Sequence, residues 1–138
     1  MTEQEKLNKE TVLRFNKEVL EKGNIDAIYE IIHPEFINHT AKGSAPGPQG
    51  IIDFTVNILR KALTDIEVEI HDQVIENNKV VTRKTVYGTH VGTFMGIAPS
   101  GKKAGIGIID IITLNNGQYT EHWSIRDVQD LIAQSSKN

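Results

Sequence analysis

Two aspartates and one histidine are the residues of this chain best suited to moving protons. Asp110 interrupts an apolar run, GIGIIDIITL, Asp127 closes the segment QYTEHWSIRD, and His39 lies at the end of EFINHT. Proton-transfer enzymes use carboxylic acids held in apolar pockets, because burial disfavours the charged form of such a group. We therefore predict as catalytic residues Asp127 or Asp110, which would move the proton, and His39, which would position or share it.

The turn between the two aspartate-bearing segments predicts how they pair. Asn116 and Gly117 are typical of the two-residue type I′ turn that joins neighbouring antiparallel strands. Counting outward from this turn places Asp110 opposite Trp123, among isoleucines on one face of the sheet, and His122 on the other face. A three-residue loop would move the pairing by one position and bring His122 to the face of Asp110.

Each of these residues also has a purely structural interpretation. Burying an unpaired carboxylate is costly, so Asp110 would alternatively be paired with an arginine or capped by backbone amides. Asp127 would alternatively cap the turn into residues 128–133, and His39 would be a hydrogen-bonded histidine at a strand end.

The segment VGTFMGIAPSGK, which follows His90, is longer than a hairpin loop needs to be. Its apolar residues and glycines predict a flap at the mouth of a small-molecule pocket. The residues that we expect to line this pocket are Phe15, Asn38, Phe54, His90, Phe94, Met95 and Trp123.

Hydrophobic periodicity predicts the elements that position these residues. Helical spacing of apolar residues indicates three N-terminal helices, which begin at a capping box of Thr2 and Glu5, at Asn24 and at Pro48. From residue 65 the period changes to two, which predicts four long strands, followed by a polar tail. These elements form an α+β fold, in which a curved, mostly antiparallel sheet wraps the helices into a cone with a pocket inside.

The composition narrows the classes of partner. A chain of 138 residues with a net charge of −3 lacks the basic surface of nucleic-acid-binding proteins, and we expect one domain spanning residues 1–138. It contains no cysteine, and its five histidines lack the spacing of a metal site, so we expect no metal. The polar N-terminus and the lack of a long apolar run predict a cytoplasmic protein that does not bind membranes.

Two stretches of the chain carry a family resemblance: GTHVGTFMGIAPSGK with the following IDIITLNNGQYTEHW, and FNKEVLEKGNIDAIYEIIHPEFINHT near the N-terminus. They resemble the SnoaL-like polyketide cyclases, which have a nuclear transport factor-like cone fold. The resemblance covers about residues 7–132. It implies a homodimer formed through the outer sheet face and a deep pocket between the helices and the sheet. It also implies an aspartate, best matched by Asp127, as a general acid/base that needs neither metal nor cofactor, and a pocket histidine matched by His39.

The predicted function is that of a cofactor-independent acid/base catalyst, of the cyclase or isomerase type, acting on a small carbonyl compound. The alternative is a non-catalytic protein of the same fold that binds a small apolar ligand or serves as a dimeric scaffold. Lys84 departs from the apolar or aromatic residue expected in its strand. If it faces the pocket, an anionic or smaller ligand fits better than a large aromatic polyketide.

Overall fold

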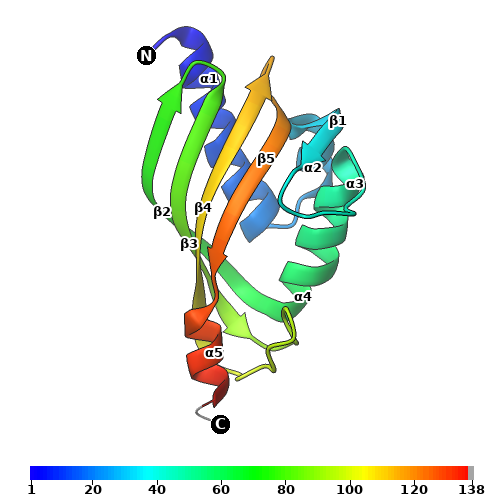
Figure 1. The fold of residues 1–138 in the computed structure, drawn as a ribbon, viewed down its shortest axis with the longest axis vertical. Coiled ribbons are helices and arrows are strands. Elements are labelled where there is room, and N and C mark those ends of the chain that lie inside the picture. The colour runs from blue at the N-terminus through cyan, green and yellow to red at the C-terminus, as the bar shows by residue number, and fades with distance from the viewer. Residues whose placement is uncertain (137–138) are drawn as a thin grey trace.

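A curved five-stranded sheet is covered on one face by helices, which confirms the predicted α+β cone (Figure 1). The computed structural model describes residues 1–136. The helical segments are α1 (Glu3–Arg14), η1 (Phe15–Glu21), α2 (Ile25–Ile31), α3 (Pro48–Ile51), η2 (Ile52–Leu59), α4 (Arg60–Ala62) and α5 (Gln129–Ser136). The strands are β1 (Ile32–Asn38), β2 (Leu63–Glu76), β3 (Lys79–His90), β4 (Lys103–Asn115) and β5 (Gln118–Asp127).

The N-terminal helices begin where the sequence predicts helix caps. The side chains of Thr2 and Glu5 form the reciprocal bonds of a capping box before α1, and Asn24 caps α2. Pro48 is the first residue of α3, where its missing amide proton costs no hydrogen bond. Segments α1 and η1 form one rod, and α3, η2 and α4 form another. Both η1 and η2 have the wider π-helical winding, which is often found at functional sites.

The C-terminal segment differs from the predicted polar tail. Residues Gln129–Ser136 form a fourth helical rod, α5, beside β4. Leu131 is fully buried there, and the carboxylate of Asp130 accepts a hydrogen bond from the Gly105 amide at 2.7 Å. A helix this short with so few apolar residues gives only a weak sequence signal. Because isolated helices of this length are marginal in water, its contacts with the sheet must stabilise it.

The strand order is β1-β5-β4-β3-β2, with β1 parallel to β5 and every other pair antiparallel. The predicted strands at 79–90 and 118–127 are confirmed residue for residue. On β3, alternate residues from Val80 to His90 point toward the helices, and Lys84 is among them. A lysine thus lies on the inner face of the sheet, where hydrophobic residues are the rule.

A β-bulge in β5 shifts the predicted pairing. The turn at Asn116 and Gly117 is as expected, and both residues have the positive φ of a type I′ turn. Leu114 faces Tyr119 as predicted, but Thr113 faces Glu121, so that one residue of β5 between these pairs has no partner on β4. From there on the two faces of β5 are exchanged relative to the prediction. Asp110 therefore faces Ser124 instead of Trp123.

The segment between β3 and β4 packs against the core. Phe94 is buried and forms a two-residue bridge with Ile97, whereas Met95 is 62% exposed. The Val91 amide donates a hydrogen bond to the Ala62 carbonyl at 2.8 Å. These backbone bonds hold the segment against α4, and its residues do not line the pocket described below. The structure therefore does not support the predicted flap.

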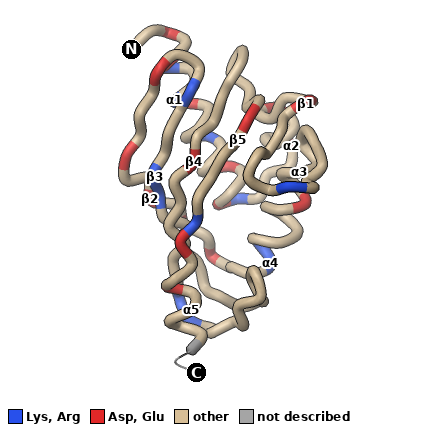
Figure 2. Tube along the Cα trace, in the orientation of Figure 1, with Lys and Arg blue, Asp and Glu red and all other residues tan. Residues whose placement is uncertain are grey.

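Charges are interspersed over the fold, and Figure 2 shows Lys and Arg alternating with Asp and Glu along the trace without a continuous basic stripe. None of the helices within residues 1–136 combines the length and the hydropathy needed to cross a membrane.

Candidate functional site

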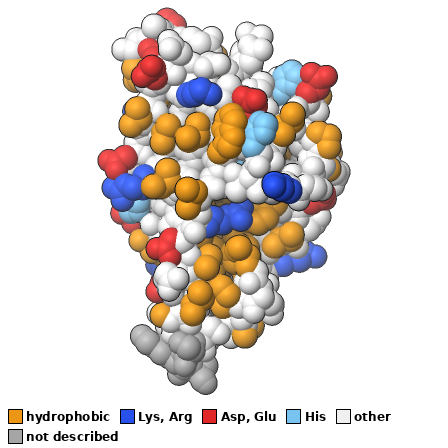
Figure 3. Space-filling view, in the orientation of Figure 1, with side chains coloured by type: hydrophobic (Ala, Val, Ile, Leu, Met, Phe, Trp, Pro, Cys, Tyr) orange, Lys and Arg blue, Asp and Glu red, His pale blue; other side chains and the backbone are white. Residues whose placement is uncertain are grey.

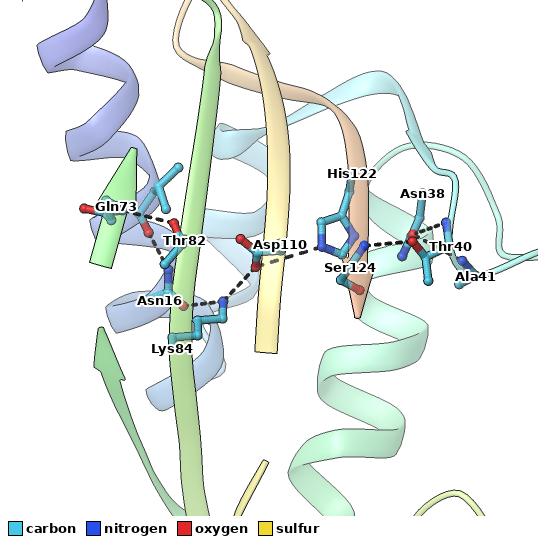
Figure 4. A network of polar contacts seen from close by, with 11 residues as sticks. Asn16, Asn38, Thr40, Ala41, Gln73, Thr82, Lys84, Asp110, His122 and Ser124 are labelled. Atoms are coloured by element: carbon cyan, nitrogen blue, oxygen red, sulfur yellow. Dashed lines mark hydrogen bonds and ion pairs between the residues drawn. The ribbon is translucent and has the colours of Figure 1, made fainter. Parts of the chain in front are cut away.

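A lysine and an aspartate form a buried ion pair at the centre of the inner sheet face (Figure 4). The Lys84 ammonium lies 3.1 Å from the Asp110 carboxylate and donates a 2.7 Å hydrogen bond to the side-chain oxygen of Asn16. Lys84 is 4% exposed and Asp110 5%. Asn16 is held in turn by a hydrogen bond from its amide group to the Val12 carbonyl at 2.8 Å. Buried charges require such pairing, and the pair thus joins β3, β4 and η1.

His122 reaches the same carboxylate from β5. Its Nε2 lies 4.0 Å from the Asp110 carboxylate. Burial lowers the pKa of His122 to about 4; the Asp110 charge opposes this shift, and the Lys84 and Arg126 charges add to it. His122 is therefore neutral at pH 7, so its contact with Asp110 is not a salt bridge at that pH.

Two buried polar atoms of this group have no hydrogen-bond partner. One is Oδ1 of Asp110, whose other oxygen faces Lys84, and the second is Nδ1 of His122. Buried polar atoms are nearly always satisfied in proteins, and a catalytic role is one of the explanations for an exception. Both residues line the pocket described next.

The pocket lies between η1, η2 and the inner sheet face. Water-sized spheres fit in about 70 Å³ of it, and its atom-free space is about 660 Å³ when the open solvent at its mouth is included. Its apolar side chains are Phe15, Leu20, Phe36, Ile51, Phe54, Leu59, Val86, Ile108 and Ile112, and its polar ones are Asn38, Thr55, Lys84, Asp110, Tyr119, His122, Ser124 and Arg126. Burial and the Asp110 charge raise the pKa of Tyr119 well above its ordinary value, so its hydroxyl remains protonated. An apolar cavity with a few convergent polar groups is typical of a small-molecule site.

Arg126 contributes a second basic group to the pocket. Its guanidinium lies over the Phe54 ring, 4.4 Å from the ring centre, and burial lowers its pKa. No carboxylate of the described residues lies within ion-pair distance of Arg126, in contrast to Lys84. The pocket thus combines one neutralised lysine with one arginine that lacks an acidic partner.

The structure separates the predicted site residues into two groups. Four of them, Asp110, Phe15, Asn38 and Phe54, line the pocket. The predicted pocket residues that lie outside its lining are His90, Phe94, Met95 and Trp123, and the predicted catalytic residues that do so are Asp127 and His39.

Three of the outlying residues lie on the opposite side of β5. Trp123 stacks against the His39 ring at 4.6 Å, and His39 also lies 3.4 Å from Glu121. Asp127 is exposed and accepts a hydrogen bond from the Gln129 amide at 2.9 Å, which is the capping role that the sequence left open. The expected pocket position of Trp123 is wrong because the bulge in β5 turns it outward.

The other three belong to the end of β3 and the following segment. His90 is fully buried, and neither of its ring nitrogens has a hydrogen-bond partner among the described residues. Phe94 contacts the Phe54 ring edge-on at 6.3 Å and so supports one pocket residue from outside the lining. Met95 is turned toward solvent by its left-handed backbone, at φ 50°.

Sequence reasoning missed His122 because it was assigned to the outer face. It missed Arg126 because this residue lies four positions further along the same predicted strand and so shares that face. Alternation along β3 places Lys84 on the same face as Val80 and Val86, so the sequence pattern could have placed it inward. The structure buries both valines fully. The structural alternative for Asp110 was pairing with an arginine or capping by backbone amides, and in the structure Asp110 pairs with a lysine. Within residues 1–136 no three His, Cys, Asp or Glu side chains are grouped as metal ligands would be.

Comparison with known proteins identifies the family. The family model for SnoaL-like polyketide cyclases matches residues 10–135. A candidate SnoaL-like polyketide cyclase from Jannaschia sp. CCS1 is 26% identical, with a TM-score of 0.85 over 100% of this chain and 97% of that one. TsrD from Streptomyces laurentii is 23% identical, with a TM-score of 0.84 over 100% and 99%.

The fold extends to proteins named for another reaction. An LEH-like epoxide hydrolase of M. tuberculosis is 14% identical, with a TM-score of 0.70 over 96% of this chain and 91% of that one, a likeness that shows the fold alone. We found no match among curated proteins. Since the family model spans nearly the whole length and the cone fold agrees, the chain belongs to the SnoaL-like polyketide cyclase family.

Proposed function

We propose that the pocket is a cofactor-independent acid/base site for a small carbonyl compound, with Asp110 and His122 as the proton-transferring residues. The observation that carries this proposal is the pair of unsatisfied buried atoms, Oδ1 of Asp110 and Nδ1 of His122, in a cavity whose lining surface is mainly apolar. A bound carbonyl compound would provide partners for both atoms. Membership of the SnoaL-like cyclase family supports this class of chemistry.

The proposed reaction is an intramolecular aldol closure. Asp110 removes a proton from the carbon beside a carbonyl group, and the enolate carbon attacks a second carbonyl of the same molecule. The proton then returns to the new alkoxide oxygen, directly or through the neutral His122. One C–H bond and the π bond of the attacked carbonyl break while one C–C and one O–H bond form, so the step consumes no co-reactant. Lys84 holds the carboxylate in position.

The experiment measures removal and return of the proton without knowledge of the natural substrate. Phenylacetone in D₂O incorporates deuterium beside its carbonyl, and NMR follows the rate with and without protein. We expect the wild type to accelerate exchange and Asp110→Asn to lose about 100-fold or more of that acceleration, because general base catalysis contributes this much.

Asp127→Asn is the matched control, since it makes the same chemical change outside the pocket. We expect it to keep the wild-type exchange rate. If Asp127→Asn abolished exchange while a folded Asp110→Asn variant kept it, the assignment of the proton-transferring aspartate would be refuted.

A second function, ligand binding without chemistry, is favoured by the Lys84–Asp110 ion pair. An ammonium in contact with a carboxylate stabilises its charged form, and a buried pair of this kind can serve structure alone. In that case Asp110→Asn would lower the stability of the protein, while no carbonyl compound that binds in the pocket would exchange its protons faster than in buffer.

We also propose that the protein is a cytoplasmic homodimer formed through the outer sheet face. Figure 3 shows hydrophobic side chains gathered over the strands on the face turned to the viewer. The exposed apolar residues of the outer face include Val74, Ile109, Ile111 and Ile125, the last 78% exposed. A patch of this kind supports association. The lack of cysteine fits a reducing compartment.

A further inference from the structure

The charges of the ionised groups in the pocket do not sum to zero. Lys84 and Asp110 neutralise one another at 3.1 Å, and His122 is uncharged at pH 7 because burial lowers its pKa. Arg126 therefore adds one uncompensated positive charge, although the whole chain carries a net charge of −3. A partly buried cation is costly unless a negative group pairs with it, so the pocket favours anionic ligands.

Arg126 is arranged to receive a planar anion. Its guanidinium lies over Phe54, 4.4 Å from the ring centre, and this contact restrains the position of the group. Within the described part of the chain its N–H groups have neither an acidic partner nor a hydrogen-bonded one. A guanidinium presents two parallel N–H donors that match the two oxygens of a carboxylate.

The rest of the pocket decides how such a ligand lies. Asp110 repels a carboxylate, so the acidic end of the ligand must lie away from it. Arg126 faces Ile108 on β4. Ile108 lies two residues from Asp110 on the same inward face, and two residues span about 7 Å along a strand. The space between is bordered by Phe54 and other apolar side chains. A ligand with a carboxylate at one end and an apolar body reaching toward His122 pairs with Arg126, keeps its charge away from Asp110 and contacts the apolar side chains between them.

We propose that this pocket selects small carboxylic acids with an apolar body, and that Arg126 binds their carboxylate. For a reacting substrate, this makes the compound an oxo acid, with its carboxylate on Arg126 and its carbonyl beside His122 and Asp110. The inference rests on the proposed function only in taking this pocket as the substrate site, because it concerns binding and not turnover.

Benzoate and benzamide test the proposal, since the two probes have nearly the same shape and differ in charge. Titration of isotope-labelled protein, followed by NMR, gives the dissociation constant of each probe and the residues whose signals shift. We expect benzoate to bind about 10-fold or more tightly than benzamide, as charge-assisted hydrogen bonds allow. The shifting signals should be those of the pocket lining.

Arg126→Gln should weaken benzoate binding to the level of benzamide and leave benzamide unchanged. Arg126→Lys should restore part of the preference, since it keeps the charge but loses the paired donors. Arg83→Gln is the matched control, because it removes the same charge from the outer face, where Arg83 pairs with Asp72. It should keep the full preference.

Three results would overturn the proposal: equal affinities of the wild type for the two probes, no binding of either at millimolar concentration, or an undiminished preference in a folded Arg126→Gln variant. A shift of signals in the outer hollow near His71 and Arg83, without any in the pocket, would also overturn it. Failure of the proposed catalysis appears separately, as benzoate binding that depends on Arg126 together with no acceleration of phenylacetone exchange.

Discussion

The neutral state of His122 predicts that acid destabilises the fold through this one residue. Burial lowers its pKa from an ordinary 6.5 to about 4 in the folded protein. The unfolded chain therefore takes up a proton at higher pH than the folded protein does. The contribution of His122 to stability is fully present above pH 6.5 and is lost as the pH falls toward 4.

The expected magnitude follows from the two pKa values. Between pH 7.5 and pH 5.0, proton uptake by the unfolded state alone lowers the free energy of unfolding by about 2 kcal/mol, and the whole shift corresponds to about 3 kcal/mol. Such a loss is large against a typical total of about 5–15 kcal/mol. His122→Gln removes the titrating group, so this part of the pH dependence should disappear.

Urea unfolding at the two pH values measures the effect, with the fluorescence of Trp123, the single tryptophan, as the signal. The loss on acidification should be about 2 kcal/mol greater in the wild type than in His122→Gln. His71→Gln, altered on the outer face of the sheet, controls for removal of a histidine as such. Equal losses in the wild type and His122→Gln would refute the burial argument, as would an NMR titration of His122 with its midpoint near 6.5.

Two further predictions concern the ion pair and the outer face. Lys84→Met should lower the free energy of unfolding by about 3–5 kcal/mol, because it leaves the Asp110 charge buried and unpaired. The double variant Lys84→Met/Asp110→Leu should recover most of this loss when the unfolding of all variants is measured in urea. Purely additive effects of the two substitutions would contradict the coupling between the residues. Ile125→Lys places a charge in the proposed interface and should convert a dimer into a monomer in sedimentation velocity, whereas a wild type that is already monomeric would contradict the proposed dimer.

The sequence was informative wherever short-range chemistry determines the structure. Helix starts at Thr2, Asn24 and Pro48 follow from caps and from the fixed φ of proline, and these starts were predicted correctly. The turn at 116–117 was predicted for the same reason, since asparagine and glycine tolerate positive φ. The resemblance of two sequence stretches to a known family predicted the cone, which the family model and the fold confirm.

The sequence was less informative where long-range packing selects between local alternatives. The segment 91–102 has the composition of a mobile loop, yet Phe94 is drawn into the core and the backbone is bonded to Ala62. Helix α5 exists because Leu131 finds a buried position against the sheet. Neither contact leaves a periodic signal, because one buried residue in a polar stretch has no pattern.

The β-bulge at Thr120 has the largest consequence for the site, because it selects which face of β5 meets the pocket. Without it, Glu121 and Asp127 would face inward, and beside the mutually neutralising lysine–aspartate pair they would give the pocket two negative charges. With it, His122 and Arg126 face inward, and the same pair leaves one positive charge. One inserted residue thus changes the ligands that the pocket favours from cations to carboxylates. Bulges are common next to active sites, and a count of residues from the turn cannot detect them.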